Sequence, residues 1–224
     1  MLITTYGIHL LILCAAFWTA IALFIRSHGS GRRLDDLRFL AGLVLGAAFA
    51  HFGWALLNLP AIRDHPEAWL NPALGYSVLL VPAGVLLLAP WSAAIKSLPL
   101  AFAVARSGCL VSGCCSGTQT ALFPWGFHTT PVYEVGLLVA LHFAVWRLRD
   151  DLVIPAVLIG FGSIRFALEP LRALPPLGEP WVSASWIAGL WIALGVGMAA
   201  APRKVLVRQD FTESARPAPA SGST

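Results

Sequence analysis

The chain of 224 residues is 58% hydrophobic and only 12% charged, and its formal net charge is +4. A soluble globular domain carries about 25% charged residues, so this composition excludes such a domain and indicates that lipid surrounds most of the chain. The positive charge is not gathered into a dense patch or an RNA-binding motif, which argues against a nucleic-acid partner.

Seven apolar segments predict membrane-spanning helices, because each approaches the roughly 20 residues that a span requires. In chain order the segments are residues 6–25, 36–59, 74–90, 94–112, 131–147, 153–172 and 182–201. Pro82, Pro90 and Pro99 interrupt the third and fourth segments, so PWSAAIKSLP between them is either a tight turn or an interfacial stretch. The sequence therefore predicts an all-α, polytopic membrane protein with one transmembrane domain, residues 1–205, and a disordered cytoplasmic tail, residues 206–224.

Basic residues concentrate in alternate connections between the predicted spans. One set of connections contains Arg26, Arg32, Arg33, Arg38, Lys96, Arg147, Arg149, Arg203, Lys204 and Arg208. The other set contains only Arg63 and Arg172. Because cytoplasmic loops carry the excess of Lys and Arg, we expect the N-terminus outside and the C-terminus in the cytoplasm. The uncharged loop at residues 113–130 then lies on the outer side.

Five ionisable side chains inside the predicted spans are candidate functional residues. They are His51, Arg106, Glu134, Arg165 and Glu169. A charge at membrane depth costs several kcal/mol unless it is paired or lines a wet cavity, so such residues point to a site. Glu134 can hold one of the arginines or act as a general base. His51 lies in the small-residue stretch AAFAHFGW, where hydrogen-bonded packing is the alternative to a catalytic role.

Two of these five residues, Arg165 and Glu169, are predicted to share a helix face with Arg172. Arg165, Glu169 and Arg172 are spaced by four and three residues, which places them on one side of a helix near its outer end. A single arginine–glutamate pair at this spacing can be purely structural, but Arg106 adds a second arginine from another span. Two buried arginines with few carboxylates predict an anionic ligand, and the guanidinium fork suits a phosphate. In the outer leaflet, that phosphate is a phospholipid head group.

Three cysteines follow Arg106 in the stretch RSGCLVSGCCSG. Cys109, Cys114 and Cys115 do not have the spacing of a structural zinc site, and only His128 is near, so no metal or cofactor is expected. On an oxidising outer face they can form a disulfide. Beside an arginine in a glycine-rich turn, one of them can instead be a reactive thiolate. Plain packing is the remaining interpretation.

Three glycines lie in the same stretch. Gly108, Gly113 and Gly117 allow the backbone to turn sharply and to approach a ligand closely. A turn of this kind leaves backbone N–H groups free for an anion. The glycines therefore add to the prediction of a phosphate site.

Four segments occur in the order in which one enzyme family carries them. They are the Tyr6–Gly7 pair, ARSGCLVSGCCSG, PVYE with Tyr133 and Glu134, and GFGSIRFALEPLR with Arg165, Glu169 and Arg172. In this order they resemble the motifs of the prolipoprotein diacylglyceryl transferases, which are seven-span enzymes of the bacterial cytoplasmic membrane. The resemblance covers essentially the whole chain.

The chain departs from that family's pattern at several positions. Cys109 replaces the asparagine of the arginine–glycine signature, and Cys114 replaces a glutamate. His51 stands where the family has an arginine in its second span. The segment GYSVLLVPAG, with Leu79 and Leu80, lacks the histidine of the family's HGG motif, which is implicated in catalysis.

The resemblance implies a reaction at the outer side of the bacterial inner membrane. A diacylglyceryl group would pass from phosphatidylglycerol, an anionic phospholipid, to the thiol of a protein acceptor, and glycerol phosphate would be released. Arg106 and Arg165 would stabilise the leaving phosphate, and Glu134 and Glu169 would orient the arginines. The remaining members of the implied phosphate site are Arg172, Tyr6, Tyr133, Gly108, Gly113 and Gly117.

Catalysis by this chain needs a base other than the family's histidine. We expect His51, Glu134 or His128 to act as the base, unless a cysteine takes the lipid group covalently. Two other functions fit the same residues. One is a thiol-based membrane enzyme that uses Cys114 or Cys115 as nucleophile or redox centre. The other is a phospholipid-binding or transport protein that performs no catalysis.

Overall fold

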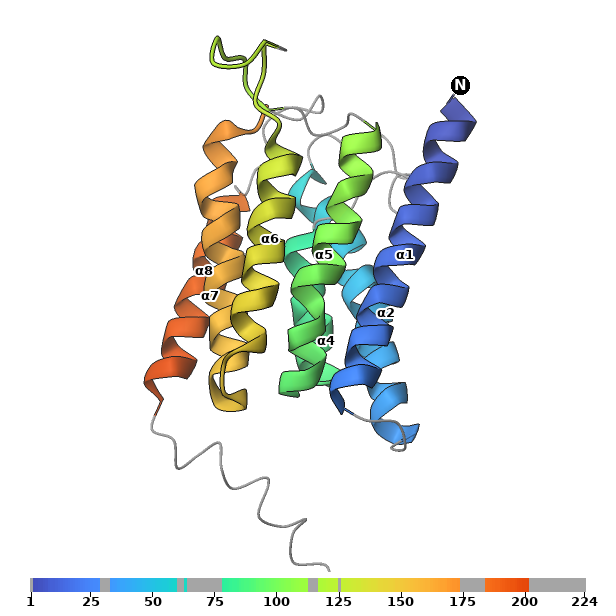
Figure 1. Ribbon diagram of the computed structural model, residues 1–224, viewed down its shortest axis with the longest axis vertical. Coiled ribbons are helices and arrows are strands. Elements are labelled where there is room, and N and C mark those ends of the chain that lie inside the picture. The colour runs from blue at the N-terminus through green and yellow to red at the C-terminus, as the bar shows by residue number, and fades with distance from the viewer. Residues whose placement is uncertain are drawn as a thin grey trace, which may run out of the picture.

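The protein is a bundle of helices (Figure 1). The computed structural model describes residues 2–28, 33–59, 63, 78–112, 117–124, 126–173 and 184–201. Its α-helices within these ranges are α1 (Leu2–His28), α2 (Arg33–Leu57), α4 (Val81–Leu88), α5 (Ser92–Ser112), α6 (Thr130–Trp146), α7 (Asp150–Leu168) and α8 (Ala184–Ala200). Two short 3-10 helices, η2 (Val78–Leu80) and η3 (Glu169–Leu171), adjoin α4 and α7. The all-helical expectation is confirmed.

Four segments are long and apolar enough to cross a membrane. They are Leu11–His28, Arg33–Leu56, Ser92–Val111 and Asp150–Leu171. The apolar helices α6 and α8 have 17 residues each. At 1.5 Å per residue they extend roughly 26 Å, slightly less than the hydrocarbon core of about 30 Å. The described chain therefore contains four full-length candidate spans and two that are slightly shorter.

The structure differs most from the prediction at the third predicted span. Instead of one helix over residues 74–90, the described part holds η2 followed by α4, which has 8 residues. Residues 74–77 lie outside the described ranges. Pro82 does not break α4, because it occupies the first turn, where its missing N–H would have no helical partner. The helix ends at Leu88, and residues 89–91 form a short connection to α5.

The helix α5 begins earlier than predicted and includes Lys96. The expectation that Lys96 lies in a connection between two spans is therefore wrong, because α5 already begins at Ser92. The Lys96 ammonium donates to Asp150 Oδ1 at the start of α7, with a distance of 2.7 Å. Pro99 lies inside α5 and does not end it. The segment PWSAAIKSLP is thus a tight turn followed by two turns of helix.

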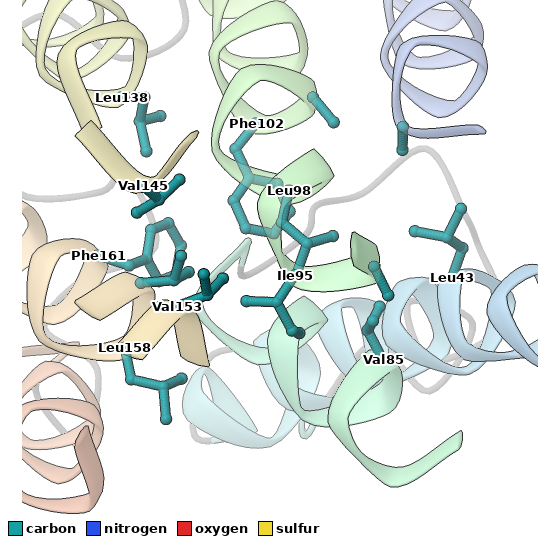
Figure 2. Packing of buried hydrophobic residues seen from close by; sticks show 14 of the residues in the cluster. Leu43, Val85, Ile95, Leu98, Phe102, Leu138, Val145, Val153, Leu158 and Phe161 are labelled. Atoms are coloured by element: carbon teal, nitrogen blue, oxygen red, sulfur yellow. The ribbon is translucent and has the colours of Figure 1, made fainter. Parts of the chain in front are cut away.

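The core forms around α5, which packs against α1, α6 and α7. Buried side chains of α5 meet those of α6 and α7 in Figure 2, which labels Ile95, Leu98, Phe102, Leu138, Val145, Val153, Leu158 and Phe161. The rings of Phe102 and Phe161 lie 5.1 Å apart between centroids. Large apolar side chains such as Trp18 and Phe143 also lie exposed on the bundle surface. Exposed apolar surface of this extent indicates contact with lipid.

One buried hydrogen bond links the two sides of the bundle. The indole Nε1 of Trp191 on α8 donates to the backbone oxygen of Leu79 in η2, at 2.8 Å. Both residues are buried. This bond connects α8, which packs on α7, to the pair formed by α2 and α4.

The topology brings three helix ends to one end of the bundle. The helices α5 and α7 end where α6 begins, and the N-terminal end of α1 lies on the same side (Figure 1). The connection from α6 to α7 lies at the opposite end and spans only residues 147–149. Polar residues near the ends of α5 and α7 and the start of α6 are therefore held close together.

Close contact between α2 and α4 depends on two glycines. A Cβ atom added to Gly84 would collide with the backbone of Gly46, and one added to Gly46 would collide with the Val81 carbonyl. We predict that Gly84→Ala lowers the melting temperature in detergent, because overpacking costs typically about 1–3 kcal/mol. Thermal unfolding followed by intrinsic fluorescence measures the change.

The matched control for this substitution is Gly136→Ala. A Cβ atom at Gly136 on α6 meets nothing within 4 Å. Alanine in a helix is favoured over glycine by roughly 0.5–1 kcal/mol, so this variant should be unchanged or slightly more stable. Equal melting temperatures for the two variants would contradict the proposed contact.

Candidate functional site

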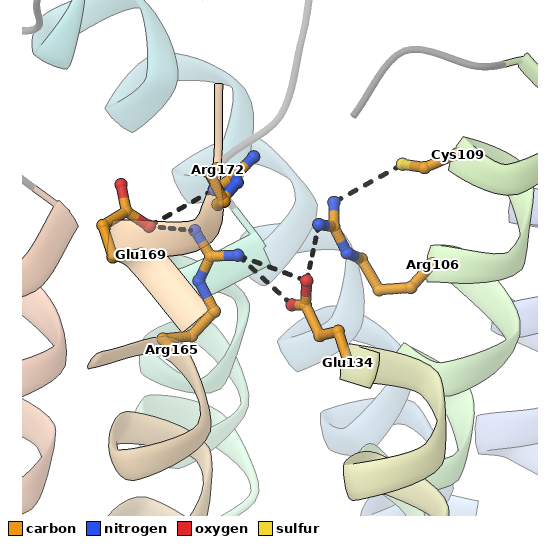
Figure 3. Close-up of polar contacts among 6 residues, drawn as sticks. All are labelled: Arg106, Cys109, Glu134, Arg165, Glu169 and Arg172. Atoms are coloured by element: carbon orange, nitrogen blue, oxygen red, sulfur yellow. Dashed lines mark hydrogen bonds and ion pairs between the residues drawn. The ribbon is translucent and has the colours of Figure 1, made fainter. Parts of the chain in front are cut away.

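The centre of the site is a carboxylate shared by two arginines. Glu134 lies in the second turn of α6 and is only 2% exposed. Its Oε2 lies 2.5 Å from Nη2 of Arg106 on α5. Both of its oxygens accept hydrogen bonds from Nη1 of Arg165 on α7, each at 3.3 Å. Glu134 therefore joins the ends of three helices (Figure 3).

The ionic chain continues along the last turn of α7 and into η3. Arg165 Nη2 donates to Glu169 Oε2 at 3.1 Å, and Arg172 Nη1 donates to the same oxygen at 3.5 Å. The shared helix face that the spacing predicts is confirmed. The expected convergence of Arg106 and Arg165 is also found, with Glu134 as the group between them (Figure 3).

The site carries a surplus of positive charge. Among the residues that the structure describes, the ion pairs join three guanidinium groups to two carboxylates, which is a surplus of one formal positive charge. Arg106 and Arg165 are 7% and 6% exposed, respectively. Arg165 Nε is buried and has no hydrogen-bond partner among the residues that the structure describes. Buried charges are stable only when paired and hydrogen-bonded, so the site is suited to one further anion.

Cys109 is the cysteine that the structure brings to the site. It lies one turn beyond Arg106 on α5, and Arg106 Nη1 lies 3.4 Å from its Sγ as a hydrogen-bond donor (Figure 3). Cys114, Cys115 and Gly113, which the sequence also indicated, lie outside the described residues.

Two predicted phosphate-binding glycines have other roles. Gly108 lies inside α5, where its backbone N–H belongs to the helix and not to a turn. The N–H of Gly117 donates to the His128 carbonyl at 2.7 Å, so it is not available to a ligand. A Cβ atom at Gly117 would collide with the carbonyls of Leu171 and His128. The expectation of free glycine N–H groups is wrong for these two positions.

Residues 117–124 and 126–129 form a small hairpin at the end of the bundle where the site lies. The N–H of Thr118 donates to the Leu171 carbonyl at 2.9 Å, and isolated bridges pair Gly117 with Arg172 and Gln119 with Phe127. The hairpin is thereby fixed to the backbone that follows Glu169. The sequence did not predict this contact, because a pairing across 53 residues leaves no local pattern.

The remaining predicted residues with described side chains are Tyr133, His128 and His51. Tyr133 precedes Glu134 on α6, and its hydroxyl lies 3.5 Å from Nδ1 of His128 in the hairpin. His51 is buried on α2, with its ring edge-on to Phe52. The helix α1 includes Tyr6, but the Tyr6 side chain lies outside the described part. The roles of these residues stay predictions.

The structure and comparisons with known proteins add two observations. Within the described ranges, no three His, Cys, Asp or Glu side chains are arranged to hold a metal ion. No family model matches the chain, and no curated protein or solved structure matches it. Any functional assignment therefore depends on the site geometry and on the sequence segments described above.

We predict that Glu134→Gln strongly destabilises the protein. The substitution keeps the size of the side chain but leaves the buried guanidinium groups of Arg106 and Arg165 without their shared counter-charge. Breaking a buried ion pair in this way costs about 3–5 kcal/mol. Thermal unfolding in detergent measures the loss.

Glu169→Gln is the matched control. Glu169 is more exposed than Glu134 and binds Arg165 and Arg172 through one oxygen. Partly exposed ion pairs contribute roughly 0–1 kcal/mol, so this variant should lose much less stability. A loss as large as that of Glu134→Gln would show that Glu134 is not the central group.

Proposed function

We propose that the protein is a membrane-embedded transferase that moves a diacylglyceryl-type group from an anionic phospholipid to a thiol or other acceptor at the outer leaflet. The single observation that carries this proposal is the pair of buried arginines, Arg106 and Arg165, on either side of Glu134. The unbalanced positive charge of the site suits a phosphodiester head group. The ordered segments that resemble the prolipoprotein diacylglyceryl transferases support the same reaction.

The proposed reaction is a displacement at a glycerol carbon. The acceptor thiolate forms a C–S bond to the carbon that carries the phosphate, and the C–O bond breaks. Glycerol phosphate leaves with the bonding electrons, and the thiol proton passes to a base. Charge develops on the leaving phosphate, where preorganised guanidinium groups of Arg106 and Arg165 lower the barrier.

Glu134 is better suited to hold the arginines than to accept the proton. Both of its oxygens already accept from Arg165, and one also contacts Arg106. His51 and His128 therefore remain as the proposed bases. His51 lies on α2 and His128 in the hairpin, and in the proposed topology both are on the outer side.

The proposal places seven spans in a bacterial inner membrane, with the N-terminus outside. Exposed arginines lie at the bundle end away from Glu134, where α1 and α6 end and where α2 and α7 begin. These residues are Arg26, Arg33, Arg38, Arg147 and Arg149. An excess of arginine at one end supports a cytoplasmic location for that end. The Glu134 site would then face the periplasm.

We predict that Arg106→Gln and Arg165→Gln each reduce lipid transfer by roughly 10²–10³-fold, the loss typical of removing one preorganised donor to a developing oxyanion. The assay uses labelled phosphatidylglycerol and a cysteine peptide, and it follows the lipidated peptide and glycerol phosphate. Arg149→Gln, which changes an exposed arginine at the other end, should retain full activity.

Two results would contradict the proposed transfer. Full activity in both site variants would remove the arginines from the mechanism. Tight copurification of phosphatidylglycerol with the wild-type chain, without any product, would favour a phospholipid-binding or transport protein.

A thiol-based reaction is the second candidate, and the contact between Arg106 and Cys109 favours it. In that mechanism a cysteine of the RSGCLVSGCCSG stretch is the nucleophile or redox centre. We expect the variant with Cys109, Cys114 and Cys115 replaced by serine to retain lipid transfer under the leading proposal. Loss of transfer in this folded variant, with inactivation of the wild type by a membrane-impermeant thiol reagent, would instead support the thiol mechanism.

A further inference from the structure

The tip of the hairpin at residues 117–124 and 126–129 exposes apolar side chains that the proposed transferase mechanism does not use. Leu122 is 79% exposed and Phe127 is 38% exposed. Ala121 and Pro124 are also exposed. In water, a loop of this composition would leave its apolar side chains exposed to solvent, which is unfavourable.

The segment that contains the hairpin is free of formal charge over a long stretch. Between Arg106 and Glu134 the chain contains no Asp, Glu, Lys or Arg, and His128 is the one titratable group of the hairpin. A surface that binds a charged partner would be expected to carry complementary charge. The absence of charge instead matches the boundary between head groups and acyl chains, where aromatic and apolar side chains are enriched.

The backbone of the tip satisfies several of its own hydrogen-bonding groups. The N–H of Thr120 donates to the Gly126 carbonyl, and the N–H of Gly126 donates to the Phe123 carbonyl, both at 3.0 Å. The N–H of Leu122 donates to Thr120 Oγ1 at 3.2 Å. Gly126 has a positive φ of 76°, which closes this turn. Groups that are already paired lose little on leaving water, so the tip can enter a less polar layer.

The hairpin stands at the outermost end of the bundle. It rises from the start of α6 and extends past the level of the N-terminal end of α1 (Figure 1). Val132, in the first turn of α6 below it, is exposed on the surface of the bundle. The tip is therefore placed to reach lipid head groups, and not the acyl chains, at this end of the bundle.

We propose that the exposed apolar side chains of the tip, within residues 121–124 and 126–127, contact the head-group region of the lipid bilayer and anchor this end of the bundle there. The Gly117 and Thr118 contacts transmit this anchor to the backbone at Leu171 and Arg172. The membrane surface at this end of the bundle is thereby held next to the Glu134 site. The inference requires only that the protein is embedded in a membrane, and it does not depend on a transferase activity.

The test measures the surroundings of position 122 in the full-length protein. Leu122→Cys is labelled with an NBD fluorophore after the native cysteines are replaced by serine, namely Cys14, Cys109, Cys114 and Cys115. The protein is reconstituted into vesicles of phosphatidylcholine and phosphatidylglycerol. Quenching is measured with lipids that carry a nitroxide on the head group, and separately with iodide on both faces of the vesicles.

Two labelled controls calibrate the result. Arg149→Cys reports an exposed position in a polar connection, and Phe143→Cys reports an exposed apolar position on α6. We expect position 122 to be quenched strongly by the nitroxide lipid and several-fold less by iodide than position 149. Phe127→Cys should give the same pattern, which guards against a local effect of one substitution.

Two outcomes would overturn the proposal. Iodide quenching at position 122 equal to that at position 149, without quenching by the nitroxide lipid, would place the tip in water. Protection from both quenchers would show that the tip is covered by protein, such as a second copy of the chain. Neither outcome would affect the proposed transferase function, which the lipid-transfer assay tests separately.

Discussion

The contact on which the site depends is the shared carboxylate of Glu134. Two guanidinium groups from α5 and α7 meet on this one side chain of α6, in a region from which water is largely excluded. In such surroundings a charge is tolerated only with complete pairing, so the ends of the three helices are constrained together. Among the described residues the ion pairs join three guanidinium groups to two carboxylates, and this surplus of positive charge is the basis for the proposed anion site.

The rest of the bundle supports that geometry. The apolar contacts of α5 with α6 and α7 set the positions from which Arg106 and Arg165 extend. At the opposite end, Lys96 and Asp150 connect the starts of α5 and α7. The two helices that carry the arginines are therefore fixed at both ends, which limits how far the guanidinium groups can separate.

Much of the architecture follows from local sequence patterns, and the remainder depends on long-range packing. Runs of apolar residues predicted the helices, and the spacing of Arg165, Glu169 and Arg172 predicted their shared face. The eight-residue length of α4 was not predicted, because hydropathy does not reveal where a helix ends inside an apolar stretch. The use of the Gly117 N–H by His128 was also missed, since a glycine that permits ligand binding and one that permits close backbone packing look alike in sequence.

The hydrogen bond from Trp191 to Leu79 carries an implication for how this chain can diverge. A carbonyl buried among apolar groups has no solvent molecule to replace a lost donor, so the residue at position 191 must supply an N–H at the full reach of an indole. Phenylalanine would keep an aromatic ring but would be smaller and would lack the N–H donor. A substitution at this position should therefore cost stability, although nothing in the primary structure distinguishes Trp191 from exposed tryptophans such as Trp18 and Trp186.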